Sequence, residues 1–429
     1  MLNRTIPPIG KPFQNIPLPA FTLAHLSNGI PVYMIQYGTV EMCEVQAIFK
    51  AGAGYGDKVG VSDFAPRNMS EGTKNFTSLA FSQALDNYGA FLEYDEGNEF
   101  ISFHLTTLSH LVAKTVPLMQ ECLVNPIFPE TEWEKLKSRT LQKLQVSQKQ
   151  TAYIAAREFP KLLFGANHGY ATTADMAEIQ VIERNDLVEY HQNYLHAGNM
   201  TFAVTGRFDE IDLMRTLEAQ FGSLPILPAN TEISTTSLPT ATSPAGAHHF
   251  EVEGGVQSSI RLGHLGFSRL HPDYDKMELV NTILGGYFGS RLMKNLREEK
   301  GYTYGIYSGW NSYLYTGAFA VQCDVGNEYI EDTLFQVKKE ISTLISAGVT
   351  ADELDLVKNY KLGQSINQRE TPSQINRTLR FALIYGISFA QLDQKYETFK
   401  ALKPDDISEL AAKYIQPDKL IEVVCGKKG

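Results

Sequence analysis

The chain lacks the features that mark several large classes of protein. No apolar run approaches the roughly 20 residues that a membrane-spanning helix needs, and no stripe of Lys and Arg interleaved with aromatic residues is present. The formal net charge is -10 and the pI is about 5.6, so the electrostatic signature of a nucleic-acid-binding protein is missing. We expect neither a membrane nor a nucleic acid as a partner.

Cysteine is also scarce. The four cysteines lie far apart, with no Cys-x-x-Cys pair and no neighbouring histidine at ligand spacing. We expect buried free thiols rather than a disulfide framework or a metal site at Cys43, Cys122, Cys323 and Cys425.

The N-terminus lacks the signals of secretion. The first residues, MLNRTIPPIGKPFQNIPLP, contain neither a charged region that leads into an apolar one nor a small-residue cleavage site. We therefore expect a cytoplasmic protein. A sequence from which a leader had been trimmed would look the same, so a periplasmic location stays open as the alternative.

The sequence does contain enough apolar residues for more than one core. A chain of 429 residues with 43% hydrophobic content normally divides into two or more domains. The segment 223–249 is rich in Pro, Thr, Ser and Ala and has no helical or strand period, which indicates a linker. We predict an N-terminal domain over 1–222 and a C-terminal domain over 250–429.

The two halves resemble each other. The stretch EWEKLKSRTLQKLQ…LLFG ends at Gly165, and ELDLVKNYKLGQSI…LIYG ends at Gly386; these ends lie 221 residues apart, as do Glu132 and Glu353. The stretches that end in MTFAVTG and LIEVVCG lie 220 residues apart. Offsets that agree this closely indicate an internal duplication.

Each half also shows the same order of expected elements. Apolar or alternating stretches predict strands at 30–38, 44–52, 100–107 and 200–206, and again at 258–267, 317–325 and 420–426. Two long amphipathic helices are expected around 131–164 and 351–385, and a final helix precedes each last strand. Because strands and helices come in blocks, we predict an α+β fold with two homologous domains, each a mostly antiparallel sheet of about five or six strands with helices packed on one face.

Five stretches carry a more specific signal. They are GVSDFAPRNMSEGTKNFTS, ECLVNPIF, LLFGANHGYATT and YHQNYLHAGNMTFAVTGRF in the first half, and LGGYFGSRLMKNLREEKGYTYGIYSG in the second. Together they resemble the pitrilysin or insulinase family of zinc peptidases, in the small-subunit branch that includes the mitochondrial processing peptidase. The resemblance extends over nearly the whole chain.

The resemblance implies a zinc site that this sequence does not retain. Family members carry an inverted zincin motif, His-x-x-Glu-His, before a Gly-Thr pair such as Gly72–Thr73, and a third ligand, a Glu, comes from a distant helix. Laid over this sequence, the two histidines become Asp63 and Arg67 and the Glu becomes Pro66. The third-ligand position falls at Lys143.

These replacements remove the metal ligands and the general base together. Arg67 and Lys143 are cations with no lone pair to give, and they would repel a dication. Pro66 has no side-chain base, and it would be tolerated in a first helical turn that Ser62 or Asp63 caps. We expect no metal in this chain, and a capped helix start with an ion pair between Asp63 and Arg67.

Other acidic residues of the first half are Glu71, Glu93, Asp95, Glu96 and Glu99. The run EYDEGNE indicates a solvated strand end beside a turn at Gly97–Asn98. In the family, the corresponding edge strand pairs with an extended peptide. Strand addition by a peptide is therefore the alternative interpretation of this run.

The second half keeps the motif LREEKGYTYG. In the family, an Arg and a Tyr seven residues apart reach toward a zinc centre formed by the other half or by a partner subunit, and the matching pair is Arg297 and Tyr304. A guanidinium can hold a peptide carbonyl, and a tyrosine hydroxyl can donate to the oxygen that becomes negative during hydrolysis. The structural alternative places Arg297 on a charged helix face and packs Tyr304 at a strand start.

Two further features are expected to be structural. GGYFGS, at Gly285–Ser290, resembles a nucleotide loop only faintly, because no Lys-Ser/Thr follows it, and it predicts close backbone packing or a turn. The histidines without paired ligand spacing are expected at the surface or in the core; they are His104, His110, His248, His249 and His264.

The pattern of one lost and one retained motif favours a non-catalytic subunit of a two-chain zinc peptidase. On this hypothesis a homologous partner holds the zinc, peptides are the substrates, and Arg297 and Tyr304 support substrate binding and the transition state. The chain alone would cleave nothing. The alternatives are a scaffold like the inactive homologues of respiratory complexes, a homodimeric peptide-binding protein, and an active peptidase with unusual ligands.

Overall fold

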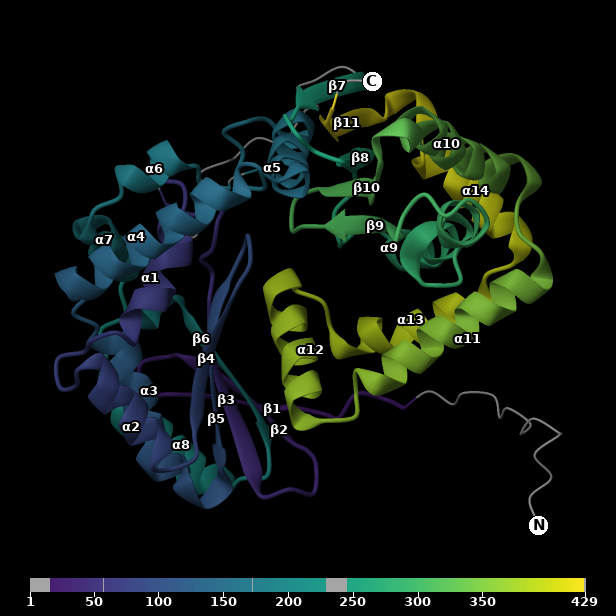
Figure 1. Ribbon diagram of the computed structural model, residues 1–429. Coiled ribbons are helices and arrows are strands. Elements are labelled where there is room, and N and C mark those ends of the chain that lie inside the picture. The colour runs from purple at the N-terminus through teal and green to yellow at the C-terminus, as the bar shows by residue number, and fades with distance from the viewer. Residues whose placement is uncertain (1–15, 57, 172, 229–244, 428–429) are drawn as a thin grey trace, which may run out of the picture.

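The computed structural model describes residues 16–56, 58–171, 173–228 and 245–427, which form two sheets with helices around them (Figure 1). The first sheet has six strands in the order β1-β2-β6-β3-β5-β4: β1 (Thr22–His25), β2 (Pro31–Gln36), β3 (Met42–Phe49), β4 (Phe91–Glu96), β5 (Ile101–Leu108) and β6 (Met200–Gly206). The second has five in the order β7-β11-β8-β10-β9: β7 (Gly246–Glu251), β8 (Gln257–Gly266), β9 (Ile306–Ser312), β10 (Gly317–Gly326) and β11 (Ile421–Gly426).

The two sheets share one topology. In each sheet all neighbouring strands are antiparallel except one parallel pair, which is β2 with β6 in the first and β7 with β11 in the second. From that pair onward, β2, β6, β3, β5 and β4 correspond in order to β7, β11, β8, β10 and β9, and β1 is an addition. The predicted α+β fold with two homologous, mostly antiparallel sheets is confirmed.

The helices of each half cover one face of their own sheet. In the first half these are α1 (Val61–Met69), α2 (Ser78–Asp86), α3 (Val112–Val124), α4 (Glu130–Ser147), α6 (Met176–Gln180), α7 (Arg184–Tyr194) and α8 (Glu210–Phe221). In the second half they are α9 (Tyr274–Asn281), α10 (Ile330–Ala347), α11 (Ala351–Asn367), α13 (Phe389–Ala401) and α14 (Pro404–Tyr414). Two large apolar cores lie beneath them, one with Phe49, Trp133 and Phe202, the other with Leu262, Phe319 and Phe399.

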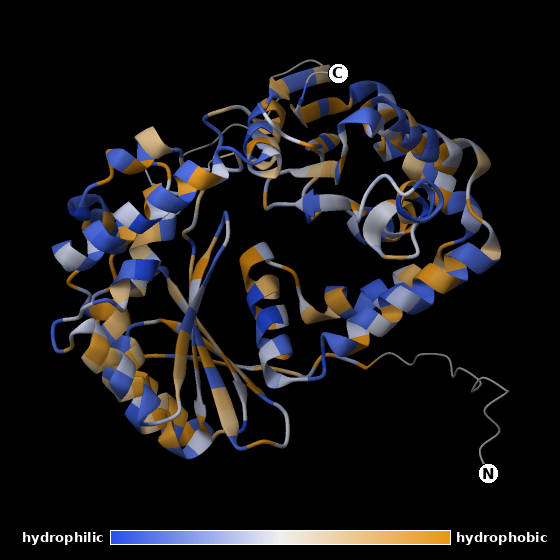
Figure 2. Ribbon diagram, in the orientation of Figure 1, coloured by the Kyte–Doolittle hydropathy of each residue, from blue (hydrophilic) through white to orange (hydrophobic). Residues whose placement is uncertain are grey.

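The other face of each sheet is covered by a helix from the opposite half. Ile375 and Leu379 of α12 (Pro372–Tyr385) pack on Ile48 of β3 in the first sheet. Phe159 of α5 (Thr151–Phe164) packs on Ile421 and Val423 of β11 in the second sheet. This reciprocal exchange is visible in Figure 1, and in Figure 2 α12 carries both orange and blue residues, as a helix with one face on a sheet should.

The exchange explains where two expectations about helices were wrong. The regions 131–164 and 351–385 each contain two helices, because the chain leaves its own half between α4 and α5 and again between α11 and α12. The second break coincides with Pro372 at the start of α12, where Thr371 forms a capping box with Gln374.

The predicted linker lies mostly outside the described residues, at 229–244. At its C-terminal end β7 begins at Gly246, so 246–249 belong to a strand rather than to a linker. Within the described part of the chain, no helix combines the length and the apolar character that crossing a bilayer would require.

Candidate functional site

The degenerate metal site lies on α1, which starts differently from the expectation. The helix begins at Val61 after Gly60, whose φ of 93° lies in the left-handed region that favours glycine. The N–H groups of Asp63 and Phe64 donate to the Gly60 carbonyl at 3.1 and 3.2 Å. The prediction that Ser62 or Asp63 caps the helix was wrong, because both lie inside its first turn.

Pro66 also lies deeper than expected, in the second turn of α1. Because proline has no N–H, the Ser62 carbonyl receives no hydrogen bond from the residue four positions along the helix. The turn is held by packing instead: Pro66 is buried, and the neighbouring Phe64 ring meets Trp133 of α4 edge-on, with centroids 5.2 Å apart. An apolar packing residue therefore occupies the place of the family's catalytic base.

A closed polar cluster surrounds the site. Asp63 Oδ1 and Arg67 Nη2 form the predicted ion pair at 2.5 Å, and Arg67 also bonds Tyr94 of β4. Glu96 of β4 accepts a hydrogen bond from Ser62 Oγ at 3.0 Å and shares another with Asp63. Burial raises the pKa of Glu96 to about 7, and the Asp63 carboxylate adds to this rise. Glu96 thus keeps a proton that it can donate to Asp63.

Zinc does not fit this donor set. The Asp63 carboxylate is already engaged by Arg67 and Glu96, and a dication there would lie beside a permanent guanidinium charge. Lys143 is exposed on α4 and forms no ion pair with a described residue. Across the described residues, no three His, Cys, Asp or Glu side chains are grouped as metal ligands.

β4, at the outer edge of the first sheet, pairs only with β5, so the main-chain groups along its other side have no strand partner. Alternation places Tyr94 and Glu96 on the face that carries α1, and Glu93 and Asp95 on the opposite face. The edge strand that the resemblance implied is present. Its pairing with a peptide stays a prediction.

The run EYDEGNE is less solvated than expected. The turn after β4 is present, with the Gly97 N–H donating to the Phe100 carbonyl at 2.8 Å. Glu99, however, is only 4% exposed, and its Oε1 accepts a hydrogen bond from the Leu314 N–H of the second half at 2.8 Å. Among the other acids of this half, Glu71 has a local role, because it accepts from Ser78 Oγ at 2.7 Å.

Arg297 and Tyr304 lie in the second half, away from the cluster on α1. Arg297 belongs to the π-helical segment Met293–Glu299, and its guanidinium stacks on the Phe288 ring at 4.4 Å. Tyr304 precedes β9 and is 91% exposed. The structural alternative, in which Tyr304 packs at a strand start, was wrong, since the loop turns its ring into solvent.

Several structural expectations hold. All four cysteines are buried and free. Gly285 lies so close to β9 that a Cβ there would be 2.7 Å from the Ser308 nitrogen, which confirms close packing at GGYFGS. His264 is buried, with Nδ1 2.7 Å from the Leu265 carbonyl, His110 and His249 are exposed, and His248 is half-buried in β7.

Sequence reasoning missed the polar groups that α12 brings to the far face of β4. Arg380 pairs with Asp95, and Asp95 Oδ2 lies 3.6 Å from His104 Nε2, so His104 is more than an isolated core residue. No local pattern signals these contacts, because Arg380 and Asp95 are 285 residues apart in the chain.

Comparisons with known proteins agree with this geometry. A family model described as Insulinase (Peptidase family M16) matches residues 32–170, and one described as Peptidase M16 inactive domain matches residues 182–361. A protein from Helicobacter pylori named Non-peptidase homolog YmxG is 24% identical over 360 residues, which are 82% of each chain. An Uncharacterized zinc protease YmxG from Bacillus subtilis is 21% identical over 368 residues, which cover 85% of this chain and 88% of that one.

A solved structure shares the whole arrangement. The crystal structure of a peptidase M16 inactive domain from Pseudomonas fluorescens superposes with a TM-score of 0.87 at 26% sequence identity. The match covers 95% of this chain and 98% of the other, so the likeness extends over both halves.

Proposed function

The chain belongs to the insulinase family of peptidases, family M16, as a non-catalytic member, and from that premise we propose that it is the substrate-binding subunit of a heteromeric zinc metallopeptidase. A homologous partner holds the zinc and the catalytic base. This chain contributes Arg297 and Tyr304 to the partner's site, and the substrates are peptides.

The exposure of Tyr304 carries the proposal. At 91% exposure, its ring packs too little to stabilise the fold, and its hydroxyl bonds no described residue. A large aromatic side chain held in water in this way is better accounted for by contact with another molecule. Arg297 is held over Phe288, which leaves its N–H groups free to donate to a peptide carbonyl.

The loss of the metal site also supports a role in which this chain binds substrate and a partner chain hydrolyses it. Asp63, Pro66 and Arg67 form a packed, hydrogen-bonded helix turn that offers neither a ligand set nor a base for activating water. Hydrolysis therefore has to take place at another chain. The open edge of β4 supplies main-chain groups with which an extended peptide can pair.

Reconstitution tests the proposal. The purified chain is mixed with a homologue that carries an intact His-x-x-Glu-His motif, and cleavage of a quenched fluorescent peptide is followed. We expect no cleavage by this chain alone and activity in the mixture. Arg297→Ala and Tyr304→Phe should each reduce kcat in the mixture by about 10²-fold, by analogy with the loss of an oxyanion donor.

Lys294→Ala serves as the matched control, because Lys294 is exposed in the same helical segment as Arg297 and has no assigned role. It should leave kcat unchanged. If both Arg297→Ala and Tyr304→Phe turned over substrate like the wild type while the complex formed normally, their supporting role would be refuted.

A further inference from the structure

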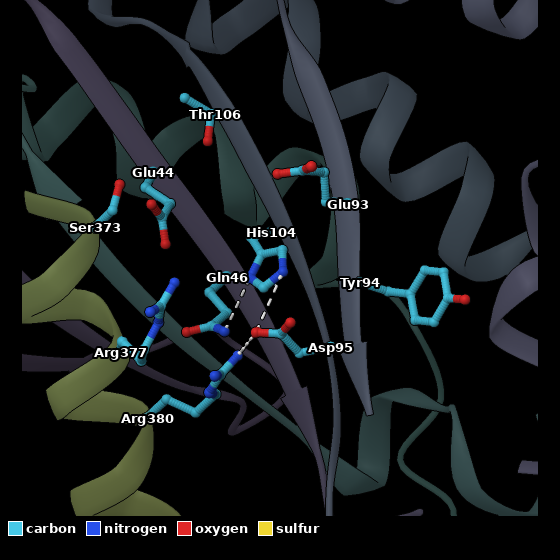
Figure 3. Close-up of a pocket in the computed structure, with 10 residues that line it drawn as sticks. All are labelled: Glu44, Gln46, Glu93, Tyr94, Asp95, His104, Thr106, Ser373, Arg377 and Arg380. Carbon is cyan, nitrogen blue, oxygen red and sulfur yellow. Dashed lines mark hydrogen bonds and ion pairs between the residues drawn. The ribbon is translucent and has the colours of Figure 1, made fainter. Parts of the chain in front are cut away.

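A polar cavity of about 320 Å³ lies between the first sheet and α12, on the face of β4 that points away from Asp63. Figure 3 shows its side chains coming from β3, β4 and β5 on one side and from α12 on the other, while the Tyr94 ring points to the opposite face. The cavity is therefore built jointly by the two halves of the chain. Its volume suits a ligand of amino-acid size rather than a large cofactor.

One wall of the cavity is a fixed hydrogen-bond network. Arg380, 8% exposed, pairs with Asp95 and donates to Ser102 Oγ at 2.9 Å. Gln46 Nε2 lies 3.1 Å from Ser102 Oγ and 3.2 Å from His104 Nδ1. Each of these groups orients the next, so the wall is preorganised.

The same network leaves one buried acceptor unused. Gln46 is 1% exposed, and its Oε1 has no hydrogen-bond partner among the described residues. Buried side-chain oxygens are normally satisfied, and an orphaned one calls for a missing donor. Because Gln46 lines the cavity, a ligand N–H placed there would supply that donor.

The charges on the remaining walls are unpaired. Glu44 of β3, Glu93 of β4 and Arg377 of α12 all line the cavity, and none of their side chains forms an ion pair or hydrogen bond with a described residue. Asp95 and Arg380 neutralise each other, and burial lowers the pKa of His104, which keeps its ring neutral at pH 7. Two carboxylates and one guanidinium remain, so the cavity has one net negative charge.

We propose that this cavity binds a free basic amino acid, with the ligand's α-carboxylate on Arg377 and its cationic groups on Glu44, Glu93 and Gln46 Oε1. A ligand with one carboxylate and two cationic groups matches the charges of the cavity, because it carries one net positive charge. Charge-assisted hydrogen bonds of this kind are the strongest that a small polar ligand can form.

Other small ligands match less well. The described residues offer no group of three metal-ligating side chains, which excludes a bare divalent ion. A phosphate or a dicarboxylate in the cavity would lie beside the carboxylates of Glu44 and Glu93, which would repel its negative charge. Neither Arg297 nor Tyr304 lines the cavity, so this inference does not rest on the peptidase subunit role.

Isothermal titration of the full chain with L-arginine tests the inference. We expect saturable binding at one site. Arg377→Ala and Glu93→Gln should each raise the dissociation constant at least about tenfold, because each removes one charge-assisted contact. Both positions are exposed, so the variants should fold, and their thermal unfolding is compared with that of the wild type.

Ligand analogues separate the two ends of the site. Agmatine lacks the α-carboxylate, so its weaker binding should be insensitive to Arg377→Ala. Citrulline lacks the guanidinium charge and should bind the wild type more weakly than L-arginine does. Arg139→Ala, at an exposed position of α4, is the matched control and should bind L-arginine like the wild type. Absence of saturable binding to the wild type, or equal affinity in all variants, would overturn the inference.

Discussion

At the scale of single residues, the former metal site has become a proton-sharing cluster. Asp63 and Arg67 stand at the positions of two of the family's zinc ligands, and with Glu96 they satisfy one another through an ion pair and hydrogen bonds. Two carboxyl groups side by side are stable only when one keeps its proton. This requirement makes the stability of the folded chain depend on pH near neutrality.

The dependence is tested with Glu96→Gln. Burial raises the pKa of Glu96 from 4.5 to about 7, so the folded chain holds a proton that the unfolded chain has released. The stabilisation that this bound proton provides is complete below the pKa that Glu96 has in the unfolded chain, and it is lost as the pH rises through 7. The wild type should lose up to about 3 kcal/mol of unfolding free energy between pH 5 and 8 from this group.

The glutamine variant should lack that loss, since its amide donates to Asp63 at every pH. Urea unfolding at pH 5 should give similar free energies for the two proteins, and at pH 8 the variant should be the more stable. Parallel pH profiles for wild type and variant would show that Glu96 titrates normally.

At the scale of elements, α5 and α12 are helices exchanged between the two halves. Each leaves its own half and fills the free face of the other sheet, where Leu379 and Phe159 are 1% and 6% exposed. Large-to-small changes at such positions remove transfer free energy and leave a cavity. Each exchanged helix should therefore stabilise the sheet on which it packs rather than the half of the chain to which it belongs.

Leu379→Ala and Phe159→Ala test the packing of the two exchanged helices on the sheets. Each should lower the free energy of unfolding by about 2–5 kcal/mol, measured by urea denaturation. Hydrogen exchange should be faster in β3 and β6 for Leu379→Ala, and in β8 and β11 for Phe159→Ala. Arg139→Ala on α4 should change neither quantity. Accelerated exchange confined to the half that carries the substitution would contradict the exchange of helices.

At the scale of the whole molecule, Glu99 joins the halves at a point beyond the packing of α5 and α12 on the sheets. It lies in the turn after β4, accepts from the Leu314 N–H in the turn between β9 and β10, and is hydrogen-bonded by Tyr385 of α12. Burial raises its pKa, and these donors oppose the rise. One carboxyl group thus gathers segments from both halves.

Glu99→Ala should loosen this contact, because it leaves buried donors without an acceptor. We expect a loss of about 2 kcal/mol in unfolding free energy and faster hydrogen exchange at Leu314. Glu99→Gln retains an acceptor oxygen and should cost less. Exchange at Leu314 that did not change in the alanine variant would contradict this role of Glu99.

The fold class and the internal repeat were predictable because they depend on local patterns. Alternating residues in β5 and β10, apolar runs in β6 and β11, and the equal offsets of the repeats follow from sequence neighbours alone. β1, β7 and β9 were not predicted, since β1 is short, β7 continues a polar segment, and Gly309 interrupts the pattern of β9. The points where α4 ends and α5 begins, and where α11 ends and α12 begins, were not predicted either. At these points the chain leaves its own half to reach the opposite one.

The sequence by itself determined that the zinc ligands are gone, since the residue types at Asp63, Pro66 and Arg67 decide this without coordinates. Only the tertiary structure decided the protonation of Glu96, the burial of Glu99, the exposure of Tyr304 and the cavity under α12. Each depends on desolvation and on partners that lie far along the chain, such as Arg380 and Asp95 at a separation of 285 residues. Local periodicity carries no information about such pairs, because the fold alone brings them together.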